Sequence, residues 1–138
     1  MKLRIKGNSL RLRLGQSEVR RLAIDGAIEE TTVFGPSKEE CFGYALVASA
    51  ESVDVSASCA DRRIVIRVPT GAIHRWAETD EVSIHAVQRA ADESDLLILI
   101  QKDFECVDAP SDESQEDAFP HPQLGAACGP AQAIERSK

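Results

Sequence analysis

Basic and aliphatic side chains alternate near the start of this 138-residue chain. The alternation runs through Arg4 and Lys6, breaks at a turn, and resumes at Arg11 and Arg13. Residues two apart share one face of a strand, so these four side chains would form the basic face of a hairpin. Cationic faces of this kind bind phosphates, so Arg4, Lys6, Arg11 and Arg13 are the candidate nucleic-acid-binding residues. The alternative is a solvated, charged strand face.

The carboxyl-terminal region contains residue types that bind zinc. They are Cys106, Asp108, Glu113, Asp117, His121 and Cys128. Structural zinc sites normally have paired, closely spaced ligands, and these spacings show no such pairing. We therefore predict no metal and no cofactor, and keep a tail metal site as one alternative.

Catalytic motifs are not evident in the sequence. His74 and His85 are accompanied by no strong nucleophile–base pattern, and there is no phosphate-binding loop or dinucleotide fingerprint. Lone histidines are more often surface or satisfied core residues than catalytic ones. We name no catalytic residue and expect a protein that is not an enzyme.

Cysteine spacing and hydropathy indicate in which cellular compartment the protein is expected. The four cysteines form no CxxC pair, which favours reduced thiols. No apolar run approaches the roughly 18 residues of a membrane span, and residues 1–6 do not resemble a secretory signal. We expect a cytoplasmic monomer or homodimer without a membrane partner.

An internal repeat organises the chain. With a shift of 54 residues and no gap, the apolar positions of the first half fall on those of the second. In each copy the apolar period changes from 2 to about 3.6 and back to 2. The aligned pairs include Leu10 with Ile64, Leu12 with Ile66, Leu14 with Val68, Leu22 with Trp76, Ile28 with Val82, and Val33 with Val87. Two unrelated stretches of a β-rich protein remain the alternative.

Each copy predicts two strands, a short helix and two further strands. The predicted strands cover residues 3–5, 10–14, 27–34, 41–48, 53–59, 63–68, 81–87 and 95–100. Gly7-Asn8-Ser9 provides the first turn, and Gly15 with Glu18 gives a capping-box-like helix start. Trp76 lies on the apolar side of the second helix, and we expect it in the core.

These elements predict a mainly β (α+β) fold: a pseudo-twofold, barrel-like sheet from two tandem ββαββ repeats, with two short helices. One β-rich domain covers residues 1–103, with repeat one at 1–52 and repeat two at 53–103. Residues 104–138 are expected to be an acidic, largely disordered tail, because eight acidic residues against two basic ones follow from Asp103 onward.

The first copy resembles the swapped-hairpin module of the AbrB/MazE type in its turn Gly7-Asn8-Ser9 and in the strand and helix that follow. The second copy shows a matching pattern in Ile66-Arg67-Val68-Pro69 and Asp80-Glu81-Val82. The resemblance implies DNA binding through hairpin arginines, or an antitoxin with an acidic arm that wraps a toxin. The residues aligned with the four basic ones are Ser58, Ala60, Val65 and Arg67, of which one is basic. A symmetric contact with DNA would need the same basic residues on both copies, and the second copy supplies only one of them. This shortage and the formal net charge of −7 disfavour DNA binding.

The whole chain also resembles an uncharacterised bacterial family. The resemblance rests on the opening Lys2-Leu3-Arg4-Ile5-Lys6-Gly7-Asn8-Ser9, and on Lys102-Asp103-Phe104-Glu105-Cys106 and Asp117-Ala118-Phe119-Pro120 near the end. It implies no known activity.

The tail offers a few candidate contacts for a protein partner, namely Phe104, Phe119 and His121. The alternative is a tail that binds nothing. Taken together, the sequence favours a non-catalytic, protein-binding or regulatory module. An AbrB-like DNA-binding regulator or antitoxin, and a protein that binds metal through its tail, are the alternatives.

Overall fold

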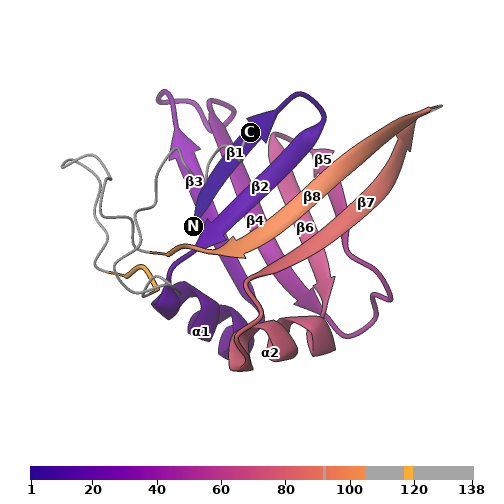
Figure 1. Cartoon of the computed structure of the whole chain (residues 1–138). Coiled ribbons are helices and arrows are strands. Elements are labelled where there is room, and N and C mark those ends of the chain that lie inside the picture. Colours follow the sequence, from indigo (N-terminus) through magenta and orange to yellow (C-terminus); the bar gives the residue numbers. More distant parts are fainter. Residues whose placement is uncertain (92, 105–116, 120–138) are drawn as a thin grey trace, which may run out of the picture.

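A computed structural model describes residues 1–91, 93–104 and 117–119 (Figure 1). The elements follow the predicted order of two strands, one helix and two strands, twice. They are β1 (Lys2–Lys6), β2 (Ser9–Leu14), α1 (Gln16–Asp25), β3 (Ala27–Val33), β4 (Cys41–Ser49), β5 (Ser56–Ala60), β6 (Arg63–Pro69), α2 (Thr70–Glu78), β7 (Ser83–Ala91) and β8 (Ser94–Lys102).

The strands form two four-stranded sheets, in the orders β1-β2-β8-β7 and β3-β4-β6-β5. Each sheet takes one hairpin from each half of the chain. In Figure 1 the first sheet lies in front of the second, and both helices lie side by side across one end. The predicted mainly β fold is therefore confirmed.

The prediction of a closed, barrel-like sheet was wrong for the described residues, which form two separate sheets. The edge strands β5 and β7 are joined by a side chain instead of a ladder of main-chain hydrogen bonds. The amide of Gln88 accepts a hydrogen bond from the Ala57 N–H at 2.7 Å and donates one to the Ala57 carbonyl at 2.9 Å. The sheets thus stay separate, with one side-chain bridge between these two edges.

The pairing registers relate the two sheets by a pseudo-twofold axis. In the first sheet Leu12 is paired with Ile100, and in the second Ile66 is paired with Leu46. A shift of 54 residues converts each member of one pair into a member of the other. The hairpins β1–β2 and β5–β6 have matching registers as well.

The third strand of the repeat departs from the predicted gapless match. Ile28 is paired with Leu46, whereas Ile84 is paired with Ile100, so Ile28 corresponds to Ile84 and not to Val82. Ile84 is 7 % exposed and Val82 39 % exposed. The predicted strand starts at residues 53 and 81 were also wrong, because β5 begins at Ser56 and β7 begins at Ser83.

The two helix ends explain this two-residue slip. α1 ends at Asp25, and the next residue, Gly26, has a left-handed φ of 86° that turns the chain directly into β3. α2 has no glycine at its end, and Thr79 leaves the helix in extended backbone. The chain therefore needs a longer connection before β7 begins.

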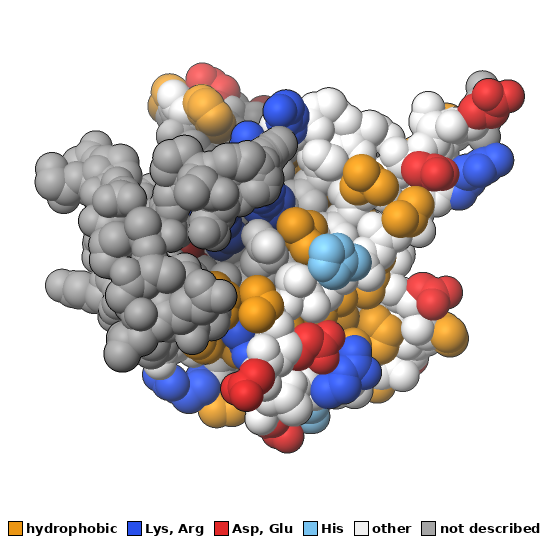
Figure 2. All heavy atoms as spheres, in the orientation of Figure 1, with side chains coloured by type: hydrophobic (Ala, Val, Ile, Leu, Met, Phe, Trp, Pro, Cys, Tyr) orange, Lys and Arg blue, Asp and Glu red, His pale blue; other side chains and the backbone are white. Residues whose placement is uncertain are grey.

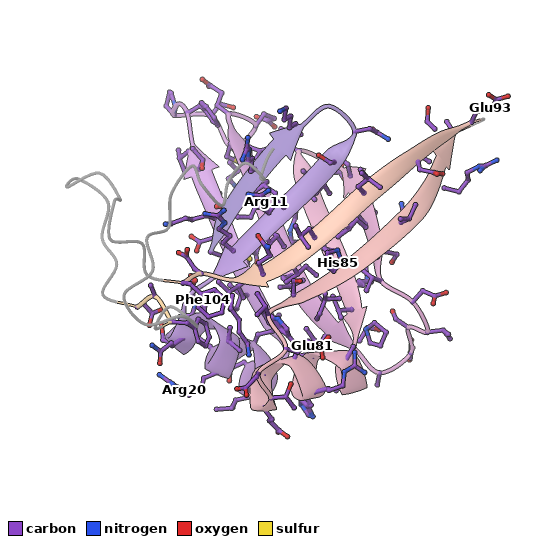
Figure 3. The ribbon with its side chains drawn as sticks, in the orientation of Figure 1. Arg11, Arg20, Glu81, His85, Glu93 and Phe104 are labelled. Atoms are coloured by element: carbon purple, nitrogen blue, oxygen red, sulfur yellow. The ribbon has the colours of Figure 1, made fainter. Side chains whose placement is uncertain are left out.

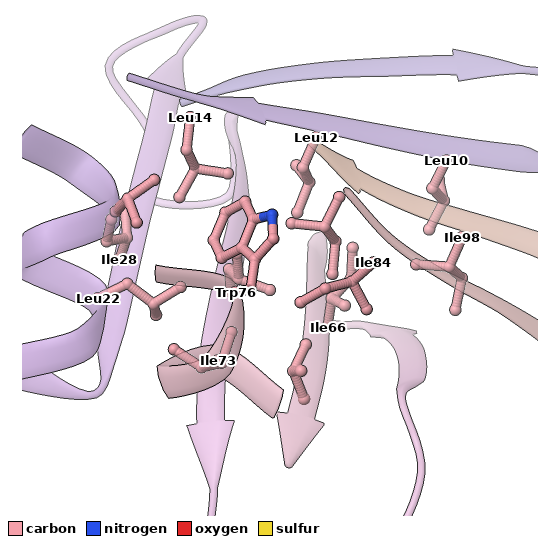
Figure 4. Packing of buried hydrophobic residues seen from close by; sticks show 14 of the residues in the cluster. Leu10, Leu12, Leu14, Leu22, Ile28, Ile66, Ile73, Trp76, Ile84 and Ile98 are labelled. Carbon is pink, nitrogen blue, oxygen red and sulfur yellow. The ribbon is translucent and has the colours of Figure 1, made fainter. Parts of the chain in front are cut away.

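The core fills the space between the sheets and the helices. Trp76 is fully buried at its centre, among aliphatic side chains from both halves (Figure 4). Its indole N–H donates to the Val82 carbonyl at 3.0 Å, which satisfies the polar atom of the ring. The prediction that Trp76 is a core residue is confirmed.

Candidate functional site

The structure brings the four predicted basic residues together on the outer face of the hairpin β1–β2. Arg4 lies directly opposite Arg11, and Lys2 directly opposite Arg13. A pocket of about 170 Å³ lies among Lys2, Arg4, Arg11 and Arg13, with Leu3 beside them. Like charges directly opposite one another destabilise a sheet. An ion pair between Lys2 and Asp103 at 3.2 Å partly offsets this repulsion, and the arrangement gathers positive charge on this face.

The same outer face continues across β8 and β7 with apolar side chains. Arg11 neighbours Leu99, which is paired with His85, and in the next row Ser9 neighbours Leu97, which is paired with Val87. Leu97 is 51 % and Val87 65 % exposed.

Figure 3 places Arg11 and His85 on the same side of this sheet, and Figure 2 shows apolar side chains beside a histidine there. We name this surface the basic–apolar face. Its residues are Lys2, Arg4, Lys6, Arg11, Arg13, His85, Val87, Leu97 and Leu99.

The equivalent face of the second sheet carries less unbalanced positive charge, because Arg63 on that face is ion-paired with Glu29 at 2.9 Å. The pseudo-twofold axis matches Arg4 with Ser58 and Arg13 with Arg67, and the registers of β5 and β6 confirm these positions. Arg67 is the one base among the equivalent residues, and its guanidinium lies 3.5 Å from the Ser58 hydroxyl. The fold is thus symmetric in backbone but asymmetric in surface charge.

Two of the three tail residues predicted to contact a partner pack against the chain's own domain. Phe104 and Phe119 form an isolated parallel bridge, with ring centroids 5.7 Å apart. The Phe119 N–H donates to the Asp103 carbonyl at 2.7 Å. The third residue, His121, lies outside the described residues. Use of these residues by a partner stays a prediction.

Asp117 supplies hydrogen-bond acceptors to the first turn of α1. Its main-chain oxygen accepts from the Gln16 N–H at 2.7 Å, and its carboxylate accepts from the Ser17 N–H at 3.0 Å and the Ser17 hydroxyl at 2.7 Å. The Gln16 side-chain amide donates to the Ala118 carbonyl at 2.8 Å. The first amides of a helix have no partner within the helix, so Asp117 caps α1 from a distant part of the chain.

We name residues 117–119 the clip, and the surface that holds them the slot. The slot consists of Gly15, Gln16, Ser17, Lys102, Asp103 and Phe104. It adjoins a cavity of about 550 Å³ that also has Arg13, Glu18 and Arg21 in its wall.

The slot was not predicted from the sequence. One signal was present: Gly15 at the start of α1 has no side-chain oxygen to cap the helix. The predicted contact between Glu18 and the Gly15 N–H is confirmed at 2.9 Å, but it leaves the next two amides to an outside group. The contact itself could not be predicted from local pattern, because Ser17 and Asp117 are 100 residues apart.

Lys102 is the buried base of the slot and also contacts the end of α2. Its ammonium donates to the Thr79 carbonyl at 2.7 Å and lies 5.4 Å from the centre of the Phe119 ring. Burial lowers the pKa of Lys102, while Asp80 and Glu81 oppose that shift. Lys102 therefore connects the end of α2 to the clip.

A partly buried ion cluster lies behind the basic face. The amino group of Met1 contacts Glu18, and Glu30 at 3.1 Å, and the Tyr44 hydroxyl donates to the Met1 carbonyl at 3.1 Å. Burial, with Glu30 and Glu18, raises the pKa of Tyr44. These contacts hold β1 against the second sheet.

The histidines and cysteines of the described residues form no evident reaction centre. His85 lies 3.1 Å from the Ser83 hydroxyl on an exposed strand face, and His74 lies 3.3 Å from the Ala23 carbonyl. Cys41 and Cys59 are free thiols. Within residues 1–91, 93–104 and 117–119, no group of three or more potential metal ligands occurs. Neither α1 nor α2 has the length and apolarity needed to span a bilayer.

Fold and surface together define a two-sheet, mainly β domain in which each sheet contains one hairpin from each half of the chain and one outer face is cationic. The chain belongs to the family of unknown function DUF7009, whose model matches residues 1–123. The match reaches beyond β8 and includes the clip. No curated protein and no solved structure matches the chain significantly.

Proposed function

We propose that this protein is a non-catalytic binding module that takes an acidic protein segment on its basic–apolar face. The observation that carries the proposal is two rows of opposed cations, Arg4 with Arg11 and Lys2 with Arg13, on a face that also exposes apolar side chains. Exposed Leu97 and Val87 lie on the same face, in the row next to that of Arg11.

The composition of this face suits a protein ligand. Protein interfaces combine apolar contacts with arginine, and arginine holds a carboxylate through two parallel hydrogen bonds. An extended segment that alternates acidic and apolar residues would place its carboxylates over β1 and β2 and its apolar side chains over β8 and β7.

The face suits duplex DNA less well. DNA affinity depends on the number of phosphates that cations neutralise. An AbrB-like regulator or antitoxin would use the same four residues, but its symmetric footprint would need a second basic face. The equivalent positions Ser58, Ala60 and Val65 supply no charge. Leu97 and Val87 would also remain unused by a phosphate backbone.

Catalysis has little support on this surface. A serine hydroxyl close to an imidazole is one part of a nucleophile–base pair, and Ser83 with His85 has that contact. Such a pair also needs a group that orients the imidazole, and no described carboxylate is hydrogen-bonded to His85.

The proposal is tested by mapping ligand contacts on the ¹⁵N-labelled full chain with NMR. The probes are a synthetic peptide of alternating glutamate and leucine, a lysine–leucine peptide as the charge control, and a 20-base-pair DNA duplex. We expect the acidic peptide alone to shift the amides of β1, β2, β8 and β7 in a saturable way. The amides of the equivalent strands β5, β6, β4 and β3 are the internal control.

Two results would overturn the proposal. The first is tighter binding of the duplex than of the acidic peptide, which would favour the DNA-binding alternative. The second is a peptide response that is equal on both sheets or absent from the first.

A further inference from the structure

We infer that the slot is a recognition site for a short peptide of the form acidic residue, small residue, aromatic residue, and that the clip is its in-chain ligand. The inference does not depend on the basic–apolar face. An external protein segment with the same three residues would compete with the clip for the slot.

Three kinds of contact hold the clip, and each involves a different part of it. The Asp117 carboxylate is bound by the Ser17 N–H and hydroxyl. The Phe119 ring packs on Phe104, near the ammonium of Lys102 and against the core. Main-chain bonds from Gln16 to Asp117 and from Phe119 to Asp103 fix the position of the peptide backbone. This combination is an isolated β-bridge at one end and helix capping at the other.

The middle position selects a small residue. Ala118 is only 8 % exposed, and the Gln16 side-chain amide donates to its carbonyl. Because Ala118 is buried, a larger side chain at this position would have to displace neighbouring atoms or enter the adjoining cavity, and either change would disturb the register of the clip.

Gly15 is the part of the slot that makes this approach possible. A Cβ on Gly15 would lie 2.7 Å from the Asp117 main-chain oxygen and 2.8 Å from its carboxyl carbon. The φ of Gly15 is −76°, a value that any residue can adopt. Glycine is thus required here for the room that the ligand needs and not for backbone conformation.

Tethering explains why a free peptide would bind the native chain only weakly. A segment joined to its own site acts at an effective concentration on the order of millimolar. An external peptide must exceed that concentration, or the clip must be removed, before the site becomes available. Removing the clip therefore provides a direct test.

The test uses the full chain with the clip disabled by Asp117→Ala plus Phe119→Ala. The probe is a fluorescein-labelled peptide of residues 114–122, followed by fluorescence anisotropy. We expect saturable binding to this variant with an affinity at least fivefold higher than to the native chain. Adding Gly15→Ala to the variant should abolish binding, and adding Gly71→Ala, whose Cβ meets nothing within 4 Å, should not.

Peptide variants test the proposed sequence preference. A probe in which the residue equivalent to Asp117 is alanine, or the one equivalent to Ala118 is leucine, should lose at least fivefold in affinity. Circular dichroism establishes that each protein variant is folded. A folded clip-disabled variant that does not bind the probe, or that binds it equally with Gly15→Ala, would overturn the inference.

A second measurement covers the case in which the clip-disabled variant does not fold. Hydrogen exchange of the Phe119 amide is followed in the native chain, with and without a large excess of the unlabelled peptide. Faster exchange with peptide supports displacement of the clip. Unchanged exchange contradicts it.

Discussion

A Cβ atom on Gly15 would lie 2.2 Å from Oδ2 of Asp117. The two residues therefore pack with no room for even a methyl group between them. Because Asp117 caps α1 and leads into Phe119, this contact couples the start of the helix to the end of β8.

Gly15→Ala is expected to lower stability by detaching the clip. Loss of a helix cap costs about 0.5–2 kcal/mol, and the packing of Phe119 adds to that. The matched control is Gly71→Ala in α2, where the Cβ has open space and alanine should stabilise the helix by up to about 1 kcal/mol. Urea unfolding of both variants measures the two opposite effects. Equal effects of the same sign would contradict this account of Gly15.

Gln88 is expected to be the main link between the edges of the two sheets. Gln88→Ala removes both hydrogen bonds to Ala57 and should cost about 1–3 kcal/mol. Gln88→Glu keeps an acceptor for the Ala57 N–H but places a second oxygen against the Ala57 carbonyl.

The glutamate variant should therefore be unstable at pH 7 and recover as the pH falls, because a protonated carboxyl can donate to that carbonyl. This sign follows from a carboxyl whose pKa is raised in the folded state. Urea unfolding at pH 7 and pH 5 checks both variants. A glutamate variant as stable as the native chain at pH 7 would contradict the proposed bridge.

Lys102 should make the stability of the chain depend on alkaline pH. Burial lowers its pKa in the folded state, so between that lowered pKa and the ordinary value of 10.5 the unfolded state binds more protons. Stability contributed at this position therefore rises with pH through that window. Lys102→Met has no such group and leaves the Thr79 carbonyl without its donor, at a cost of about 1 kcal/mol at neutral pH.

The measurement is the difference in unfolding free energy between the native chain and Lys102→Met at several pH values from 7 to 10. The difference should grow in favour of the native chain as the pH rises. Other titrating groups are common to both proteins and cancel. A difference that does not change with pH would contradict the buried-lysine interpretation.

Hydrophobic periodicity predicted the strand and helix order because each half-buried element has its own period. The same alternation placed Arg4 and Arg11 on one face, and the strand register confirms their pairing. The start of β7 was wrong by two residues because it depends on how α2 ends, and Thr79 carries no strong stop signal.

Sheet closure and the slot depend on contacts between residues far apart in the sequence. Whether β5 and β7 pair directly or through Gln88 is decided by side-chain packing, which a repeat alignment does not contain. Asp117 has no local pattern that points to Ser17. Such contacts become visible only when the fold brings distant segments together.

One of the two pseudo-equivalent faces is proposed to bind an acidic protein segment, and a matched pair of substitutions distinguishes it from the other face. Arg13 and Arg67 occupy equivalent registers, opposite Lys2 and Ser56. Calorimetric titration of the alternating glutamate–leucine peptide should show a several-fold loss of affinity for Arg13→Gln and no change for Arg67→Gln. Equal affinities of both variants, or a loss confined to Arg67→Gln, would contradict the claim.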